Sequence, residues 1–180
     1  VDRYQRQCGA PAGRSAYREA VEVSELVRQT RAAVAKLLGV SDWRRIVWTA
    51  NGTDSLNLAI QGLVRPGQHV VTTAAEHNSV LRPLHWLATH HRVSVDYAPC
   101  DPQGAVAIDD IVRLLRPETR LVAVVQASNV TGAVNDVATL AAECRRRDIL
   151  LLVDAAQSLG QWPLQVGDEG PDLIAAPGHK

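Results

Sequence analysis

Arg120-Leu-Val-Ala-Val-Val-Gln126 and Ile149-Leu-Leu-Leu-Val-Asp154 are short apolar runs that end on polar side chains. Runs without polar alternation are typical of strands buried on both faces of a parallel sheet. Between them, Val137 to Arg147 carries apolar residues at helical spacing. A strand, a helix and a second strand in this order predict a right-handed crossover within one sheet. These runs therefore favour the α/β class.

The same alternation extends over most of the chain. The predicted helices are Ala16 to Leu38, Thr53 to Leu63, Ser79 to His90, Asp109 to Leu115 and Val137 to Arg147. The predicted strands are Ile46 to Thr49, His69 to Thr73, Val93 to Ala98, Arg120 to Gln126, Ile149 to Asp154 and Asp172 to Ala175. We therefore expect a three-layer α/β/α arrangement around a mainly parallel sheet.

Composition narrows the class of protein. The chain has 180 residues, is 46% hydrophobic and carries a formal net charge of 0, which argues against nucleic acid or a membrane as a partner. The three cysteines are widely spaced and form no CxxC pair, so we expect reduced thiols and a cytoplasmic protein. No histidine has metal-ligand spacing, and no metal is predicted. The histidines expected at the surface are His69, His85, His90 and His91.

Polar residues follow several of the predicted strands. In parallel sheets, ligands bind outside the carboxyl ends of the strands. Thr53 follows one such end within Asn51-Gly-Thr, and this turn is either an anion site at a helix start or a plain threonine cap. His77 follows the next strand, where an imidazole stacks on a planar ring or moves protons, or is an ordinary loop residue.

The two later strand ends carry an amide and a carboxylate. Asn129 follows one buried strand, and it either serves a site or stabilises its own turn. Asp154 ends a fully apolar strand, where a carboxylate needs a cation or several donors unless it caps the next turn. Gln157 adds a polar group three residues on, which favours a site. Lys180 follows the last strand, where desolvation would lower its pKa, as Schiff-base chemistry needs.

In this order and spacing, the segments resemble the class V aminotransferase family of pyridoxal-phosphate enzymes, closest to the cysteine desulfurase and selenocysteine lyase group. The resemblance runs from about the Ala12-Gly-Arg14 turn to the end of the chain. The matching stretches are Asn51-Gly-Thr-Asp-Ser-Leu-Asn-Leu-Ala59, Glu76-His-Asn-Ser-Val-Leu-Arg-Pro83, Ala127-Ser-Asn-Val-Thr-Gly132, Leu152-Val-Asp-Ala-Ala-Gln157 and Gly178-His-Lys180. The motifs specify the cofactor class better than the reaction.

The resemblance implies roles for individual residues. Lys180 would hold pyridoxal 5'-phosphate as a Schiff base and move the proton of the substrate's α carbon. Asp154 would pair with the ring nitrogen and keep the ring an electron sink. Gln157 would bond the ring's phenolic oxygen, and His77 would stack on the ring and act as an acid or base.

The resemblance also assigns the remaining positions. Thr53 and His179 would bind the phosphate with backbone N–H groups of the helix start, among them that of Gly52, while Asn129 would lie near the ring oxygen. The sequence departs from the family twice. Pro177 replaces a frequent serine, and Gly52 replaces a frequent second threonine, so the phosphate loses hydroxyl donors.

The family also implies what lies outside these residues. Family members continue past the lysine into a further strand that pairs with Ile46 to Thr49, a small C-terminal domain and a loop cysteine that takes sulfur. None of the three cysteines matches that cysteine by position. We therefore expect residues 1–180 to be a partial large domain of fold-type I, incomplete and without the small domain. We expect this fragment alone to be inactive.

The resulting expectation is a cysteine desulfurase-like enzyme. When full length, it would remove sulfur or selenium from cysteine or selenocysteine, leaving alanine, with a protein as the sulfur acceptor and a homodimer as the assembly. An aminotransferase or a β-lyase of the same family remains an alternative. The other alternative is an inactive fragment or pseudoenzyme that serves as an interaction module.

Overall fold

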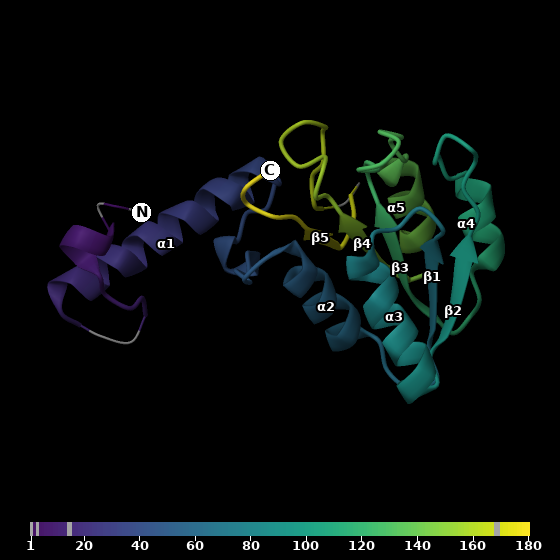
Figure 1. Cartoon of the computed structure of the whole chain (residues 1–180), viewed down its shortest axis with the longest axis horizontal. Helices are drawn as coiled ribbons and strands as arrows, with labels where there is room; N and C mark the ends of the chain where they lie inside the picture. Colours follow the sequence, from purple (N-terminus) through teal and green to yellow (C-terminus); the bar gives the residue numbers. More distant parts are fainter. Residues whose placement is uncertain (1, 3, 14–15, 168–169) are drawn as a thin grey trace. The chain divides into compact units, whose positions relative to one another are not determined.

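The structure is a computed structural model that describes residues 2, 4–13, 16–167 and 170–180. The chain divides into two compact units, Val1–Val47 and Trp48–Lys180. Figure 1 follows the chain from one terminus to the other and labels its helices and strands. Within the described ranges, no helix is both long and apolar enough to cross a membrane. The same residues contain no cluster of potential metal ligands.

The first unit is built around one long helix, α1 (Arg18–Leu37). A short π-helix, η1 (Tyr4–Cys8), and a 3-10 turn, η2 (Trp43–Arg45), pack against it. Its buried cluster is small and holds Ala10, Ala20 and Val23. The helix confirms the predicted one to within two residues at each end.

The second unit contains a five-stranded sheet in the order β2-β1-β3-β4-β5, and all four pairings are parallel. The strands are β1 (His69–Thr73), β2 (Ser94–Ala98), β3 (Thr119–Val125), β4 (Leu150–Asp154) and β5 (Leu173–Ala175). The chain leaves β1 toward one edge and then returns to add β3 on the other side, so the strand order reverses between β1 and β3. Such a reversal opens a crevice at the carboxyl ends of the two strands.

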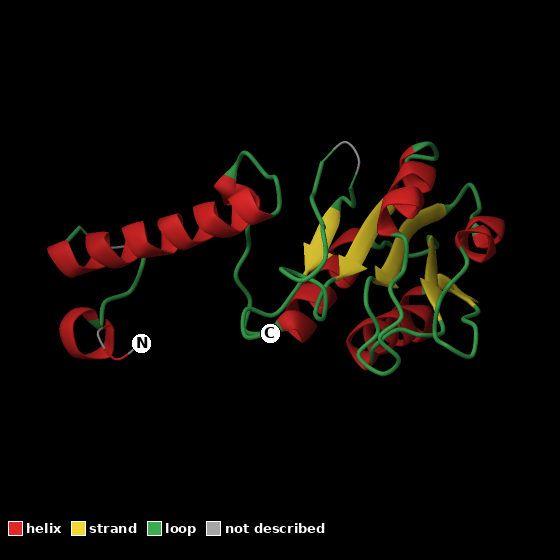
Figure 2. Ribbon diagram, turned by 90° about the horizontal axis from the view of Figure 1, so that it is seen from above, coloured by secondary structure: helices red, strands yellow, loops and turns green. Residues whose placement is uncertain are grey.

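Helices cover both faces of this sheet, as Figure 2 shows, and the expected α/β/α layering is confirmed. On one face, α2 (Gly52–Leu63) and α3 (Asn78–His91) bury Leu56, Ile60 and Leu84 against the strands. On the other face, α4 (Ile108–Leu114) and α5 (Val137–Arg145) bury Ile111 and Leu140. Both faces of β3 and β4 are therefore covered, which explains why their sequences are continuously apolar.

Two predictions about secondary structure need correction. Residues 46–49 form no strand, because a strand needs a ladder partner and none of the described residues pairs with them. Val47 and Trp48 are accordingly 62% and 45% exposed. Helix α5 ends at Arg145 rather than Arg147, because Asp148 adopts a left-handed φ of 55° and turns the chain into β4.

The prediction of a surface position for His69 is wrong. His69 is 0% exposed, because it begins the central strand β1 and neighbours from β2 and β3 enclose it. Its Nδ1 shares a 2.7 Å hydrogen bond with Thr119 Oγ1, and its Nε2 lies 3.3 Å from Asp96 Oδ2. Desolvation lowers the pKa of this imidazole, and the nearby Arg116 lowers it further.

Candidate functional site

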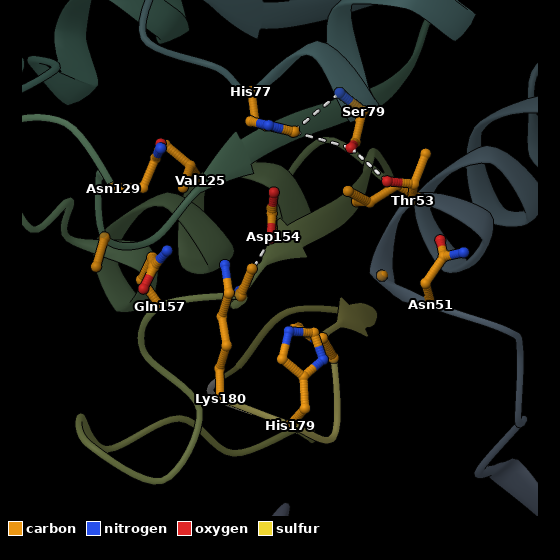
Figure 3. A pocket seen from close by; sticks show the side chains of 15 residues that line it. Asn51, Thr53, His77, Ser79, Val125, Asn129, Asp154, Gln157, His179 and Lys180 are labelled. Atoms are coloured by element: carbon orange, nitrogen blue, oxygen red, sulfur yellow. Dashed lines mark hydrogen bonds between the residues drawn. The ribbon is translucent and has the colours of Figure 1, made fainter.

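A cavity of about 200 Å³ opens at the carboxyl ends of the strands. Its walls come from the segments that follow β1, β3, β4 and β5, together with the start of α2 (Figure 3). The structure thus brings together every residue that the sequence nominated for a site, namely Gly52, Thr53, His77, Asn129, Asp154, Gln157, His179 and Lys180. They lie up to 128 positions apart in the chain, from Gly52 to Lys180.

Helix α2 presents its amino end to this cavity. The helix begins at Gly52, and Asn51 is its cap, with Oδ1 accepting from the Asp54 N–H at 2.9 Å. The threonine-cap interpretation of Thr53 is therefore wrong. Because first-turn N–H groups have no intrahelical acceptor, those of Gly52 and Thr53 remain available, and no described residue bonds them. A helix start of this kind favours an anion.

Three side chains join the ends of α2 and α3 in one hydrogen-bonded row. Thr53 Oγ1 lies 2.8 Å from Ser79 Oγ, and Ser79 Oγ lies 2.8 Å from His77 Nδ1. The Ser79 N–H also donates to His77 Nδ1 at 3.2 Å, so the imidazole caps helix α3. These contacts hold the His77 ring at the cavity wall (Figure 3). The sequence did not single out Ser79. Thr53 lies 26 residues away in the chain, and the contact with His77 depends on the conformation of the loop before α3.

Asp154 ends β4 and is 4% exposed. Its Oδ1 accepts from the Ala156 N–H at 2.9 Å, which is the turn-capping role that the sequence offered as one alternative. Desolvation raises the pKa of the carboxyl, and the backbone bond, His77 and Lys180 oppose that rise. In Figure 3 the Lys180 side chain extends toward Asp154. A cationic N–H donor in the cavity would satisfy this carboxylate.

Glu76 lies behind the cavity and was missed as a functional candidate. It is 7% exposed and fills the crevice between β1 and β3, where Oε1 accepts from Thr73 Oγ1 at 2.6 Å and from Val125 N at 2.9 Å. Its Oε2 is buried without a partner among the described residues. Burial raises the pKa of this carboxyl to about 8, and Asp154 contributes. The sequence signal is weaker than that of Asp154, because Glu76 comes three residues after β1 and that strand ends on two threonines.

Asn129 and Gln157 complete the wall on the β3 and β4 side. The turn after β3 is held by Ser128, whose Oγ accepts from the N–H groups of Val130 and Thr131 at 3.2 and 3.3 Å. The interpretation that Asn129 stabilises its own turn is therefore not supported, and its amide stays exposed at the cavity. Gln157 is half-buried beside Asp154.

The segment after β5 forms the last wall. Pro177, His179 and Lys180 line the cavity, and both His179 and Lys180 are exposed to it. A Cβ at Gly52 would lie 3.5 Å from Pro177 Cδ, which is ordinary contact. The two positions that depart from the family pattern are therefore neighbours, and the proline ring faces the bare backbone at the start of α2.

Comparisons with known proteins agree with this arrangement. The family model described as "Aminotransferase class-V" matches residues 1–180. Cysteine desulfurase IscS of Shewanella pealeana is 36% identical over 176 residues, which is 96% of this chain and 43% of that protein. Cysteine desulfurase IscS of Aeromonas salmonicida is 38% identical over the same length and coverage. The chain thus spans less than half the length of these curated relatives.

Solved structures show the same fold. The apo structure of a cysteine desulfurase from Thermococcus onnurineus NA1 superposes with a TM-score of 0.91 at 31% identity, over 99% of this chain and 45% of that one. A structure titled "SspA in complex with cysteine" also gives a TM-score of 0.91, at 26% identity, over 98% of this chain and 51% of that one. The second structure is a complex with cysteine.

Proposed function

This chain belongs to the aminotransferase class-V family, and we propose that its protein uses pyridoxal phosphate to remove sulfur or selenium from cysteine or selenocysteine, leaving alanine. The observation that carries the proposal is the single cavity that unites Lys180, Asp154, His77 and the start of α2. Support for this reaction within the family comes from the similarity to cysteine desulfurases in sequence and in structure. Cysteine as the substrate is further supported by the ligand named for the SspA structure.

The donor set of the cavity fits the cofactor. Asp154 offers a buried carboxylate whose pKa is raised by desolvation, and a protonated ring nitrogen would supply a cationic partner for it. The open N–H groups of Gly52 and Thr53 offer the helix start to a phosphate. Gln157 and Asn129 present amides to the cavity that would hydrogen-bond a ring oxygen. Lys180 supplies the amine that would hold the cofactor.

Each residue would then have one task. When bound, pyridoxal phosphate supplies an electron sink for the charge left when the proton on the substrate's α carbon is removed. Lys180 Nζ would take and return that proton, because it is the amine in the cavity. His77 would cover the ring and donate or accept a second proton at Nε2. Asp154 would keep the ring nitrogen protonated through its charge, and His179 would face the phosphate.

The rest of the protein is part of the same proposal. Residues 1–180 would be part of the large, cofactor-binding domain of a longer homodimeric protein, whose further residues supply the small domain and the cysteine that takes sulfur. The relatives' greater length supports this. A sulfur-acceptor protein would follow from the same reaction. Free thiols at Cys8, Cys100 and Cys144 support a reducing, cytoplasmic setting.

Cofactor binding can be tested on this chain with a matched control. The sequence has two lysines, Lys36 in α1 and Lys180 in the cavity. We expect pyridoxal phosphate to give the absorbance of a lysine-bound cofactor, and borohydride to fix it to Lys180. Lys180→Ala should abolish both signals, and Lys36→Ala should retain both. A folded wild-type chain without the absorbance, or label that persists in Lys180→Ala, would refute the cofactor assignment.

The reaction is tested on the full-length gene product supplied with cysteine. Alanine together with cofactor-dependent loss of the thiol sulfur is the expected result. Pyruvate in place of alanine would indicate a β-elimination, and transfer of the amino group to an oxo acid would indicate an aminotransferase.

A further inference from the structure

We propose that Ser79 is a positioning residue that makes the place of the proton on His77 depend on whether an anion occupies the start of helix α2. The inference rests on the proposed function, in which that anion is the phosphate of pyridoxal phosphate. It concerns the row Thr53–Ser79–His77, which the proposed reaction does not itself explain. Figure 3 shows this row along the upper wall of the cavity.

Counting protons gives the row a direction. His77 Nδ1 receives the Ser79 N–H at 3.2 Å, so Nδ1 is an acceptor and the neutral imidazole carries its proton on Nε2. The 2.8 Å contact between Ser79 Oγ and Nδ1 must then use the Ser79 hydroxyl proton. Ser79 Oγ can consequently only accept in its 2.8 Å contact with Thr53, so Thr53 Oγ1 donates to it. All protons in the row therefore point toward His77.

An anion at the helix start reverses that direction. A phosphate oxygen accepts hydrogen bonds but has no proton to give when ionised, so Thr53 can bond it only by turning its hydroxyl proton toward it. Thr53 Oγ1 then becomes an acceptor for Ser79, and the Ser79 hydroxyl rotates away from His77. Ser79 Oγ is left as an acceptor 2.8 Å from Nδ1, and a proton on Nδ1 satisfies it. The Ser79 N–H then gives up its longer, 3.2 Å contact with Nδ1.

The consequence falls on the face of His77 that lines the cavity. Each hydroxyl keeps its own proton and only rotates, while the imidazole proton moves from Nε2 to Nδ1 by exchange with water. Nε2, which none of the described residues bonds, changes from a donor into an acceptor. Phosphate occupancy would thereby prepare His77 to accept a proton in the cavity, and the chain without a phosphate would hold it as a donor.

A second hydroxyl pair, between α2 and the segment that precedes it, provides a contrast. Ser55 Oγ lies 2.7 Å from Thr49 Oγ1, and this pair touches no imidazole and does not line the cavity. Ser79, by comparison, is only 7% exposed and sits between a cavity threonine and a cavity histidine. Both serines carry one hydroxyl in a hydroxyl pair, so the same substitution at Ser55 controls for the loss of an ordinary hydrogen bond.

The test follows the protonation of Nδ1 by nitrogen-15 NMR of the whole chain labelled at its six histidines, with His77 assigned through His77→Gln. Without ligand, we expect a bare Nδ1. Saturating pyridoxal phosphate should produce protonated Nδ1, pyridoxal without its phosphate should not, and inorganic phosphate added to pyridoxal should restore the change. Ser79→Ala should abolish the change, whereas Ser79→Thr and Ser55→Ala should retain it.

The outcomes separate this inference from the proposed function. If pyridoxal phosphate binds Lys180 but Nδ1 stays bare, or if Ser79→Ala responds like the wild type, the inference is overturned and the proposed function stands. If pyridoxal phosphate does not bind the folded chain, both fail. Because Ser79→Ala keeps the backbone N–H that is capped by His77, the variant retains the start of α3, and unfolding midpoints compared with Ser55→Ala verify this.

Discussion

The two ends of the same sheet treat their buried polar side chains differently. At the amino ends, His69 is enclosed by Thr119 and by an acidic neighbour, Asp96, which also bonds Arg116. At the carboxyl ends, Glu76 Oε2, Gln126 Oε1 and Ser158 Oγ are buried without hydrogen-bond partners among the described residues. At the amino ends, His69 Nε2 is also buried without a hydrogen-bond partner among them, although it lies 3.3 Å from Asp96 Oδ2. The carboxyl ends thus hold more unsatisfied buried polar atoms than the amino ends, and the cavity opens at the same edge of the sheet.

The difference shows which end is built for a ligand. Buried polar atoms in folded proteins nearly always have partners, so a local excess of unsatisfied ones marks strain or a missing group. A histidine beside a hydroxyl does not by itself distinguish the ends, because His69 and His77 both contact one. What distinguishes them is the cavity beside His77. Matched substitutions at the two ends should therefore have different effects on ligand binding.

The largest expected effect comes from replacing Asp154, the carboxylate at the end of β4. Asp154→Asn should weaken pyridoxal phosphate binding by roughly 3–5 kcal/mol, more than a hundredfold, because the ring cation loses its buried partner. The same change at the other end, Asp96→Asn, should leave the dissociation constant unchanged. Absorbance titration measures both. Equal weakening by the two variants would show that the ends do not differ in ligand binding.

Glu76 should give the next largest effect, on stability. Its folded pKa of about 8 exceeds its ordinary value of 4.5, so the fold favours the protonated acid. The stability from this group is present below pH 4.5 and is lost as the pH rises through 8, by on the order of 2–4 kcal/mol. Glu76→Gln should flatten that decline in urea unfolding of the cofactor-free chain. If the free energy of unfolding of Glu76→Gln falls with pH as steeply as that of the wild type, the decline does not come from Glu76.

His69 should show the opposite dependence on pH. Burial lowers its folded pKa below 6.5, so its contribution to stability is present above pH 6.5 and is lost as the pH falls. His69→Leu should remove this acid-side loss. It should also cost about 1–3 kcal/mol at pH 7, because the Thr119 hydrogen bond disappears. Cofactor affinity should not change, and urea unfolding across pH together with the absorbance titration checks both statements.

Arg116 should have the smallest effect. Its guanidinium bonds Asp96 but is 46% exposed, so Arg116→Ala should cost at most about 1 kcal/mol. Because Arg116 lowers the pKa of His69, the substitution should raise that pKa and narrow the acid-side loss of stability. A larger loss of stability at acid pH, measured by urea unfolding, would contradict this effect of Arg116 on the pKa of His69.

Several elements of the fold could be predicted because their signals are local. The apolar runs of β3 and β4 and the helical spacing between them define the layers. The polar residues after these strands could be recognised from their position in the sequence. The strand predicted over residues 46–49 failed, since β-propensity does not supply a ladder partner. The surface position predicted for His69 failed for a related reason, because its enclosure depends on strands β2 and β3.

The sequence by itself determined the alternation of strands and helices and the identity of the groups at their ends, because periodicity and chain order are properties of neighbouring residues. Only the tertiary structure decided that Glu76 enters the crevice between β1 and β3, and that Ser79 joins Thr53 to His77. These contacts follow from the order of the strands and the packing of α2 on α3. Such long-range pairing is set by burial of the whole sheet, which no single segment encodes.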